Sequence, residues 1–242
     1  MTGLIDSTEM YLRTLYELRE EDVRPLRARL VERLRLSAPA VSEATARLAS
    51  VGLVEVGIDR MVHLTEPGLA RATQVMRKHR LAELLLSDVI GLDWRLVHQE
   101  ACRWEHVISD DVEQRLTVVL GDPQHCPHGN LIPTAAAAEG VTAAPSAPKS
   151  LLAAAGAEEV HVTLAWLSES LQTDDSAIQR LYEAGLLPGT CLAVSSAPNG
   201  VRVQRLDEEA DQTAAGPDLI ELDAHTAGLI YVESAKPDEG KA

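Results

Sequence analysis

Residues 37–68, SAPAVSEATARLASVGLVEVGIDRMVHLTEPG, are the stretch that decides the fold. Ser37 can cap the N-terminus of a helix, and Pro39 suits the first turn of that helix. Apolar residues then recur at helical spacing and are expected to face inward: Val41, Ala44, Leu48 and Val51. These features predict a helix that begins directly after Ser37.

The flanking residues indicate that this helix is the second helix of a larger motif. Upstream, PLRARLVERLRL predicts another helix from about Pro25, separated from the next by a short break at 36–38. Downstream, residues 53–56 and 61–64 alternate as two short strands around a turn at 57–60. Two helices joined by a short break form a helix-turn-helix, and the hairpin that follows makes it a winged helix.

Helices are also predicted on both sides of this motif. The first is expected over about 7–20, a long one from Pro67 to about Ile90, and the next over roughly 95–120. The last two helices carry more apolar surface than a small monomeric domain needs, which indicates a helical homodimer interface. The apolar positions are Leu84, Leu85, Val89, Ile90, Trp94, Val97, Ala101, Trp104, Val107 and Ile108.

The C-terminal part has a different pattern. An Ala/Pro-rich segment, bounded at 141–150, reads as a linker. Beyond it, one helix is predicted over 174–184, together with five short strands. The strands are expected at 160–167, 190–195, 201–206, 219–223 and 229–234. This predicts a small β-rich domain behind a mostly α-helical N-terminal two thirds.

The composition indicates a cytoplasmic protein with no membrane partner. The 242 residues include no run of about 18 apolar ones, the length that spans a bilayer. The N-terminus, MTGLIDSTEMYLRTLYEL, lacks the basic-then-apolar layout of a secretory signal. The three cysteines are odd in number and widely spaced, which fits a reducing compartment.

The distribution of charge indicates a nucleic-acid partner that the total charge hides. The net charge is −15, but residues 134–242 alone contain 6 basic and 17 acidic side chains. Residues 24–47 contain six Arg against only Glu32 and Glu43. A basic patch on a helix-turn-helix favours double-stranded DNA as the ligand, although exposed Arg on a helix is also common without one.

Two predicted helices carry side chains that bind transition metals. His98, Cys102, Glu105 and His106 are separated by three or four residues, which places them on one helical face. The preceding helix offers His79 and Glu83, also four apart. A single His or Glu on a helix is usually a solvated residue, but six donors in phase favour a metal centre, with two sites as the better interpretation. The CPHGN segment at 126–130 lacks the second half of a zinc ribbon and reads as a turn.

Five segments, TEMYLRTLYEL, RPLRARLVERL, VMRKHRLAE, VHQEACRWEHV and GNLIP, give the chain its resemblance to a known family. The chain resembles the diphtheria toxin repressor family of iron-dependent transcriptional regulators, without gaps over about residues 1–133. The resemblance implies a winged-helix DNA-binding domain and a metal-binding and dimerisation domain, followed by the linker and an SH3-like domain. The implied bounds are 1–73, 74–140, 141–150 and 151–242.

The same resemblance implies ligands for each site. The regulatory metal site would use Met10, Cys102, Glu105 and His106. The ancillary metal site would use His79, Glu83 and His98, with Glu169 and Gln172 from the third domain. Arg80 and Asn130 would hold an anion near the ancillary site, where Cys126 replaces a serine of the family.

Contacts to DNA are expected from the helix-turn-helix and the hairpin. The candidates are Arg27, Arg29, Ser37, Pro39, Ala40, Ser42, Glu43, Arg47 and Arg60. Glu43 stands where the family typically carries glutamine. A carboxylate is repelled by phosphates, although it can accept a hydrogen bond from N4 of cytosine, so Glu43 leaves the operator preference open.

The expected function is an Fe²⁺-activated repressor of iron homeostasis genes, with two Fe²⁺ sites per subunit. A homodimer, or two, would bind a palindromic operator. A thioether and a thiolate favour Fe²⁺ over Mn²⁺, while Co²⁺, Ni²⁺, Zn²⁺ or Mn²⁺ should substitute in vitro. The nearest alternative is a manganese-responsive regulator of the same fold. A metalloenzyme would need a general base that nothing in the sequence marks, so no enzyme is expected. A metal storage protein would not need the winged helix, and Glu105 and His106 fit ligation better than a redox role for Cys102.

Overall fold

The computed structural model describes residues 2–134, 149–206 and 219–235. The chain divides into two compact units. The first contains 1–92, 99–126 and 131–147, and the second contains 93–98, 127–130 and 148–242. Within the described ranges, no helix is long and apolar enough to cross a membrane.

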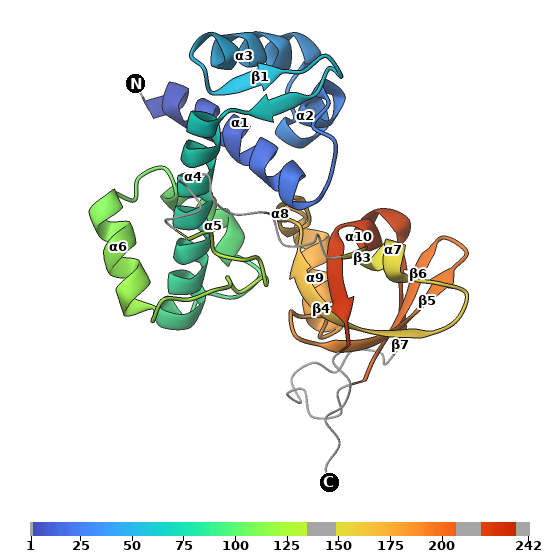
Figure 1. Ribbon diagram of the computed structural model, residues 1–242. Coiled ribbons are helices and arrows are strands. Elements are labelled where there is room, and N and C mark those ends of the chain that lie inside the picture. Colours follow the sequence, from blue (N-terminus) through green and yellow to red (C-terminus); the bar gives the residue numbers. More distant parts are fainter. Residues whose placement is uncertain (1, 135–148, 207–218, 236–242) are drawn as a thin grey trace. The chain divides into compact units, whose positions relative to one another are not determined.

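The first unit begins with the predicted winged helix (Figure 1). Helix α1 (Thr2–Glu20) starts before the expected residue 7, and it is followed by α2 (Arg27–Leu34), α3 (Ala38–Ser50) and the hairpin β1 (Val54–Val56) and β2 (Val62–Leu64). The Ser37 side chain accepts a hydrogen bond from the Ala40 amide, so the predicted N-cap is confirmed. Left-handed Arg35 ends α2 and makes the turn short.

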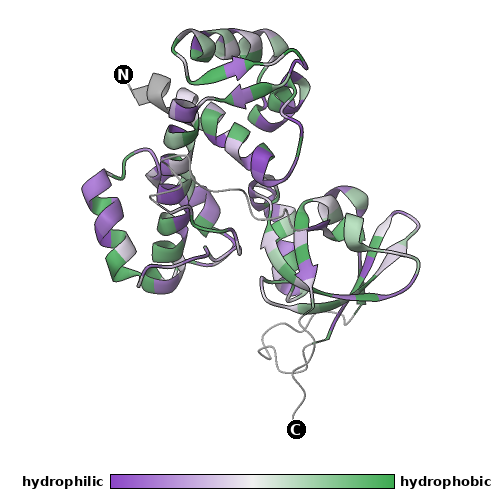
Figure 2. Ribbon diagram, viewed as in Figure 1, coloured by the Kyte–Doolittle hydropathy of each residue, from purple (hydrophilic) through white to green (hydrophobic). Residues whose placement is uncertain are grey.

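Apolar side chains of α1, α2, α3 and the hairpin form one core. Its buried members include Tyr11, Leu12, Leu15, Leu18, Leu30, Val41, Leu48, Val54 and Val62. In Figure 2, hydrophobic and hydrophilic residues alternate along these helices, as expected of helices with one buried face. The prediction that Val51 faces inward is wrong, because Val51 follows the last turn of α3 and is 63% exposed.

Helix α4 (Glu66–Leu84) begins at Thr65, whose side chain accepts from the Gly68 amide. A Cβ at residue 68 would lie 1.8 Å from the Leu53 carbonyl oxygen, so only glycine lets α4 pass this close to the hairpin. A π-helical segment, η1 (Leu85–Ile90), continues α4 and ends at left-handed Gly91.

The prediction of one helix over 95–120 is wrong. The structure has α5 (Val97–Trp104) and α6 (Asp110–Val119), separated by residues 105–109. Ser109 caps α6 by accepting from the Val112 amide, and three acidic residues follow in the first turn, where the helix dipole favours them. The break therefore places Glu105 and His106 just beyond the end of α5.

Only part of the apolar stripe proposed for dimerisation is exposed. Val89, Ile90 and Val107 are exposed, the last by 78%, whereas Val97 and Ala101 are fully buried. A small core of Leu81, Leu116, Cys126 and Ile132 connects α4 to α6 and to the chain that follows it.

The second unit contains a six-stranded antiparallel sheet in the order β3-β8-β4-β5-β6-β7 (Figure 1). The strands are β3 (Lys149–Ser150), β4 (Val160–Leu167), β5 (Cys191–Ala197), β6 (Gly200–Arg205), β7 (Leu219–Asp223) and β8 (Ile230–Ser234). The helices are α7 (Leu151–Ala154), α8 (Glu169–Gln172), α9 (Asp175–Glu183) and α10 (Ala224–Gly228). The predicted strands and α9 are thus present, and the fold class is confirmed. Of the predicted linker, 141–148 lies outside the described residues, and residues 149–150 form β3 instead.

Two short segments from the helical part of the sequence belong to this second unit. Trp94 packs against its hydrophobic core, stacks on Tyr182 and donates a hydrogen bond to the Pro127 carbonyl. Residues 126–130 form the predicted turn, in which Gly129 has a φ of +85°. A Cβ there would lie 2.1 Å from the Ala165 carbonyl oxygen, so the turn requires glycine.

Candidate functional site

Helix α1 has two faces with different tasks. Its apolar face belongs to the winged-helix core, and α1 also packs along α4. Its second face carries Glu9, Met10, Arg13 and Glu17, at the three- and four-residue spacing of one helical face. Met10 is half-buried on this face. A single rigid helix therefore links the DNA-binding motif to a polar cluster with α4 and the end of α5.

Arg13 is the centre of that cluster. Its Nε lies 2.7 Å from Glu17 Oε1, and its Nη1 lies 2.7 Å from Glu105 Oε2 and 3.3 Å from Cys102 Sγ. The same Nη1 is 3.4 Å from Nδ1 of His79. Arg13 and Glu105 are both buried, at 2% exposure each. Two predicted metal ligands, Glu105 and Cys102, thus accept from one cationic nitrogen, and a third, His79, lies beside it.

The second carboxylate oxygen of Glu105, Oε1, faces His106, another ligand predicted for the regulatory site. Glu105 Oε1 is buried, accepts no hydrogen bond in the part of the chain described, and lies 3.3 Å from Nε2 of His106. Nδ1 of His106 lies 2.7 Å from Oε2 of Glu9, whose other oxygen accepts from Arg71. A carboxylate that orients one imidazole nitrogen while the other faces a donor group is a common arrangement around bound metals.

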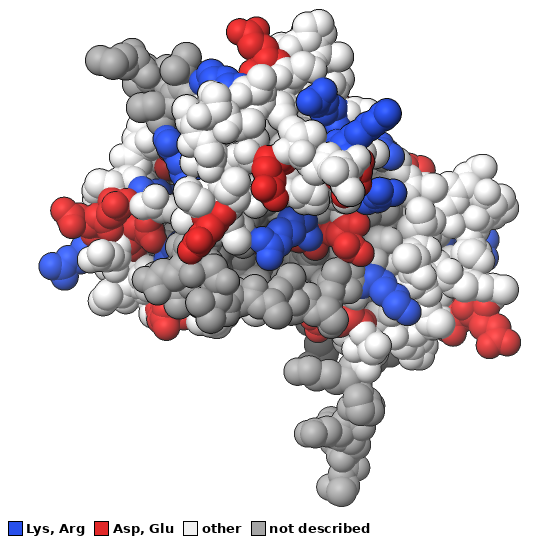
Figure 3. All heavy atoms as spheres, turned by 45° about the horizontal axis from the view of Figure 1, so that its top comes forward, with Lys and Arg blue, Asp and Glu red and all other residues white. Residues whose placement is uncertain are grey.

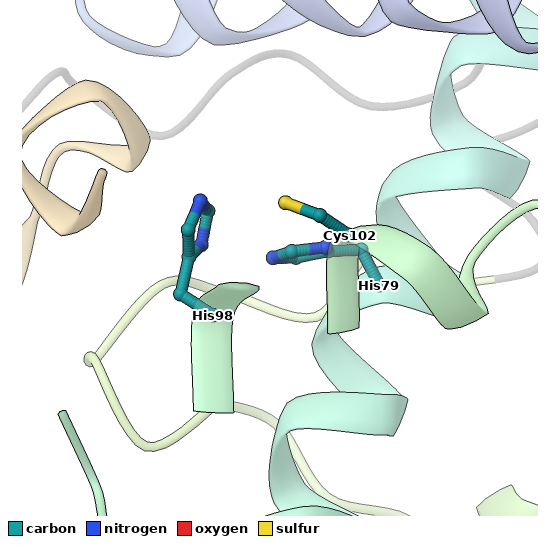
Figure 4. A group of neighbouring side chains, drawn as sticks. All are labelled: His79, His98 and Cys102. Atoms are coloured by element: carbon teal, nitrogen blue, oxygen red, sulfur yellow. The ribbon is translucent and has the colours of Figure 1, made fainter. Parts of the chain in front are cut away.

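His79 extends the cluster along α4. Its Nδ1 is 2.6 Å from Glu105 Oε2, and its Nε2 is 3.0 Å from Glu83 Oε1. Both His79 and Glu83 are fully buried. Figure 4 shows His79 on α4 and Cys102 on α5 side by side, with a ring nitrogen and the sulfur within 4.8 Å. His98 lies one helical turn before Cys102.

The second unit contains the other residues predicted for the ancillary site. His98 Nδ1 lies 3.3 Å from Glu169 Oε2, and both residues are buried. Ser168 caps α8, which carries Glu169 and Gln172. The Gln172 amide donates to Oδ1 of Asn130 at 3.0 Å and to the Leu167 carbonyl at 2.9 Å. Glu169 and Gln172, which the resemblance implies as ancillary ligands, therefore contact His98 and Asn130, respectively.

Arg80, predicted to hold an anion, has protein partners at its guanidinium. It forms two hydrogen bonds with the Glu20 carboxylate, at 2.9 and 2.6 Å, and donates to the Leu131 carbonyl at 2.7 Å. Its side chain is fully buried. The carboxylate of Glu20 is the anion that Arg80 binds in this structure.

The predicted DNA contacts lie on α2, on α3 and at the tip of the hairpin. Arg27, Arg29, Ser37, Pro39, Ser42, Glu43 and Arg60 are exposed, and Ala40 and Arg47 are half-buried. Figure 3 shows basic side chains gathered on the side of the molecule where α2 lies. Arg60 occupies the left-handed turn of the hairpin at φ +64°. Exposed arginines can contact the phosphate backbone of DNA, and an exposed helix face can enter a groove of the duplex.

Three residues of the cluster were missed by sequence reasoning: Glu9, Arg13 and Glu17. Their spacing of four residues is visible in the sequence, but a charged row on a helix is usually a solvated face. The signal that could have found them is their phase with Met10, the ligand that the family resemblance already placed on this helix.

The electrostatics of the cluster favour an ionised Glu105. Burial alone would raise its pKa, but the charge of Arg13, the hydrogen bond with His79 and the charges of His79 and His106 together lower it. The pKa of Glu9 is likewise lowered: burial raises it, and the contacts with His106 and Arg71 outweigh burial. An ionised Glu105 beside an imidazole and a thiol gives a suitable donor set for a divalent transition metal, and an ionised Glu9 can orient that imidazole.

A pH dependence of stability follows from Glu105. Because its pKa is below its ordinary value of 4.5, its ionised form stabilises the folded protein at higher pH. That contribution is lost as the pH falls from about 4.5 through the lower folded-state pKa. Urea unfolding of the metal-free protein between pH 7 and pH 3 should show it. An identical pH profile in Glu105→Gln would contradict this assignment.

Glu9 should support metal binding without being a ligand itself. The variant Glu9→Gln keeps the shape of the side chain but removes the charge that orients His106. We expect metal affinity to fall by about 10–100-fold, as is typical when a carboxylate partner of a ligating histidine is lost. Isothermal titration with Co²⁺ measures this change. Arg71→Gln, which removes the other partner of Glu9, is the control and should change the affinity much less.

A winged helix whose first helix also reaches a cluster of metal-binding side chains defines a metal-dependent, DNA-binding transcriptional regulator. The chain belongs to the iron-dependent repressor family. The model of the family's N-terminal DNA-binding domain matches residues 3–62, and that of its metal-binding and dimerisation domain matches 65–134. The resemblance found in the sequence is thereby confirmed, and the protein is a repressor rather than an enzyme.

Two relatives of the chain agree with this assignment. The chain is 49% identical to the iron-dependent repressor IdeR of Mycobacterium tuberculosis over 204 residues, 83% of this chain and 88% of that protein. It is 45% identical to the diphtheria toxin repressor of Corynebacterium efficiens over 218 residues, 87% of this chain and 95% of the other.

Solved structures with a similar fold include a manganese-dependent repressor and a protein named IdeR. A manganese-dependent transcriptional repressor in complex with manganese has a TM-score of 0.78 and 28% identity, and the match covers 94% of this chain and 99% of that one. The IdeR protein of T. acidophilum has a TM-score of 0.72 and 27% identity, with 93% and 97% covered. The fold therefore defines a metal-dependent repressor without selecting the metal.

Proposed function

We propose that this protein is an Fe²⁺-activated repressor of iron homeostasis genes. The observation that carries the proposal is the convergence of Cys102 and Glu105 on one cationic nitrogen, beside His106. A thiol, a carboxylate and an imidazole that already face a cation are a donor set for a transition metal. Glu105 Oε1, which accepts no hydrogen bond from the described residues and lies beside His106, supplies a buried lone pair for the same purpose.

The regulatory ion would be held by Met10, Cys102, Glu105 and His106. The ancillary ion would be held by the ligands that the resemblance implies, His79, Glu83, His98, Glu169 and Gln172, giving two ions per subunit. The pairs His79–Glu83 and His98–Glu169 support this second set, since each joins an imidazole to a buried carboxylate. Arg80 and Asn130 are proposed to hold an anion in place of their present partners, which are Glu20 for Arg80 and Gln172 for Asn130.

The chemistry of the donors favours iron. Thiolate and thioether are softer ligands than the carboxylates and carbonyls that suit Mn²⁺, so Cys102 and Met10 select against manganese. Co²⁺, Ni²⁺ and Zn²⁺ should replace Fe²⁺ in vitro, because affinity alone does not exclude them. Ligation requires the thiolate and a neutral imidazole, so activation is expected to weaken as the pH falls.

When bound, the metal would supply a link between Met10 on α1 and the ligands at the end of α5 and just after it. The protein itself converts that link into a change in DNA binding. Met10 lies on the helix whose opposite face contributes Tyr11 and Leu12 to the winged-helix core. Fixing α1 to Cys102 and Glu105 therefore fixes the winged helix to the dimerisation domain. Metal binding can shift the protein from its inactive state toward its DNA-binding state only by the difference in metal affinity between these two states.

In that state, two recognition helices of a homodimer would enter successive major grooves of a palindromic operator in the cytoplasm. One or two dimers would occupy each operator. Exposed apolar residues of η1 and of the segment after α5, including Val89, Ile90 and Val107, supply the dimer interface. The exposed arginines of α2 supply phosphate contacts, and Ser42 and Glu43 of α3 face the base edges.

The test is anaerobic operator binding by the full-length chain, using an operator selected from random DNA by the Fe²⁺-loaded protein. Fluorescence anisotropy at matched free concentrations of Fe²⁺ and Mn²⁺ compares the two metals. We expect activation at lower free Fe²⁺ than Mn²⁺. Equal or stronger activation by Mn²⁺ would favour the manganese-responsive alternative, and no activation by either metal would reject the proposal.

A further inference from the structure

A single nitrogen of Arg13 contacts two ligands proposed for the regulatory metal and lies near one proposed for the ancillary metal. Nη1 is 2.7 Å from Glu105 Oε2, 3.3 Å from Cys102 Sγ and 3.4 Å from His79 Nδ1. Nη1 has two N–H groups, and their acceptors are the carboxylate of Glu105 and the sulfur of Cys102. Both acceptors belong to the ligand set proposed for the regulatory metal.

The charges around Arg13 explain why this position attracts cations. Among the described residues of this cluster, the buried carboxylates of Glu17 and Glu105 both pair with Arg13, and those of Glu83 and Glu105 pair with His79. Buried carboxylates need cationic partners, so the guanidinium occupies an acceptor that a metal cation would also use. Because arginine does not lose its proton in proteins, Arg13 cannot become neutral when that cation arrives.

We propose that Arg13 is a built-in competitor of the regulatory metal and sets the metal concentration at which the repressor is activated. This inference rests on the proposed function and adds a control of the same site. The metal requires lone pairs of Cys102 and Glu105 that Nη1 contacts, and two cations at one set of donors repel each other. Glu17, which is outside the ligand set, gives Arg13 a carboxylate to retain when it leaves those donors.

A purely structural role for Arg13 has the opposite consequence. If the guanidinium only oriented Glu105 for ligation, its removal would weaken metal binding. If it competes with the metal, its removal strengthens metal binding. The sign of the change in affinity therefore separates the two roles.

The experiment is a Co²⁺ titration of the full-length protein, followed by the thiolate-to-metal charge-transfer absorption that reports Cys102 ligation. We expect Arg13→Gln to bind Co²⁺ about tenfold more tightly than wild type, within the usual range for coupling between two competing ligands. Arg33→Gln is the matched control, since Arg33 pairs with the buried carboxylate of Glu21. It should leave the Co²⁺ affinity unchanged. Equal or weaker Co²⁺ binding by Arg13→Gln overturns the inference.

A second measurement on wild type covers the case in which Arg13→Gln does not fold. The ¹⁵N signals of the Arg13 guanidinium, assigned with Arg13→Lys, are recorded during titration with diamagnetic Zn²⁺. We expect them to change at the first equivalent of Zn²⁺, while the Arg33 signals stay constant. Unchanged Arg13 signals overturn the inference. If wild type shows no thiolate band with Co²⁺, the proposed function fails, which is a different outcome from a bound metal that ignores Arg13.

Discussion

Replacing Met10 with alanine is expected to abolish metal-dependent operator binding while leaving the fold intact. Met10 is half-buried on the polar face of α1, so alanine removes little of the packing that Tyr11 and Leu12 provide. It does remove the only proposed ligand that belongs to the DNA-binding motif. The metal would still be bound by the remaining donors, more weakly, but it would no longer join α1 to Cys102 and Glu105.

Anaerobic anisotropy with the selected operator measures this loss, and circular dichroism checks the fold. Wild type should require Fe²⁺ for operator binding, and Met10→Ala should show the same weak binding with and without it. The control is Met10→Leu, which keeps the apolar volume but lacks the sulfur, and it should behave like the alanine variant. Retained metal-dependent binding in Met10→Ala would refute the coupling through α1.

The winged helix was predictable because its signals are local. The cap at Ser37, the proline after it and the alternation of the hairpin strands each act within a few residues, and the structure follows them. The helix over 95–120 was mispredicted for a related reason. Apolar periodicity continues through the break at 105–109, and only the capping potential of Ser109 with its acidic first turn marks the new start.

The candidate ligands were only partly predictable from the spacing of residues in the sequence. Spacing alone selected Cys102, Glu105 and His106, since three and four residues describe one face of a helix. It could not select Met10 or Glu169, because each lies far along the chain from its cluster. Glu169 sits in α8, a helix of four residues that is too short to show a periodicity. Resemblance to the family supplied both positions.

Arg13 shows why the electrostatics of the site could not be read from the sequence. In the sequence Glu9, Arg13 and Glu17 form a charged row like those on many solvated helices. Only the packing of α1 against α4 and the end of α5 buries Arg13 and Glu17 and brings Nη1 to Glu105. Whether a charged side chain is solvated or belongs to a buried ion-pair cluster depends on its burial, and tertiary contacts determine that burial.

Replacing Glu105 with glutamine is expected to have the largest effect on both metal binding and stability. The amide keeps the size of the side chain but cannot act as an anionic ligand, so the metal concentration for activation should rise more than about 100-fold, beyond the effect of losing an outer carboxylate. The variant also leaves the buried charge of Arg13 without one of the two carboxylates that lie 2.7 Å from its guanidinium. Breaking one side of a buried ion pair costs about 3–5 kcal/mol, so the metal-free protein should be less stable by that order.

Urea unfolding and Co²⁺ titration measure the two effects separately. Glu113→Gln is the matched control, because Glu113 pairs with Arg77 at 2.9 Å in a less buried position away from the ligands. It should cost less stability and leave the Co²⁺ affinity unchanged. A Glu105→Gln protein that binds Co²⁺ as wild type does would remove Glu105 from the ligand set. One that loses Co²⁺ binding without losing stability would show that Arg13 does not depend on this carboxylate, because only the ligand role would then remain.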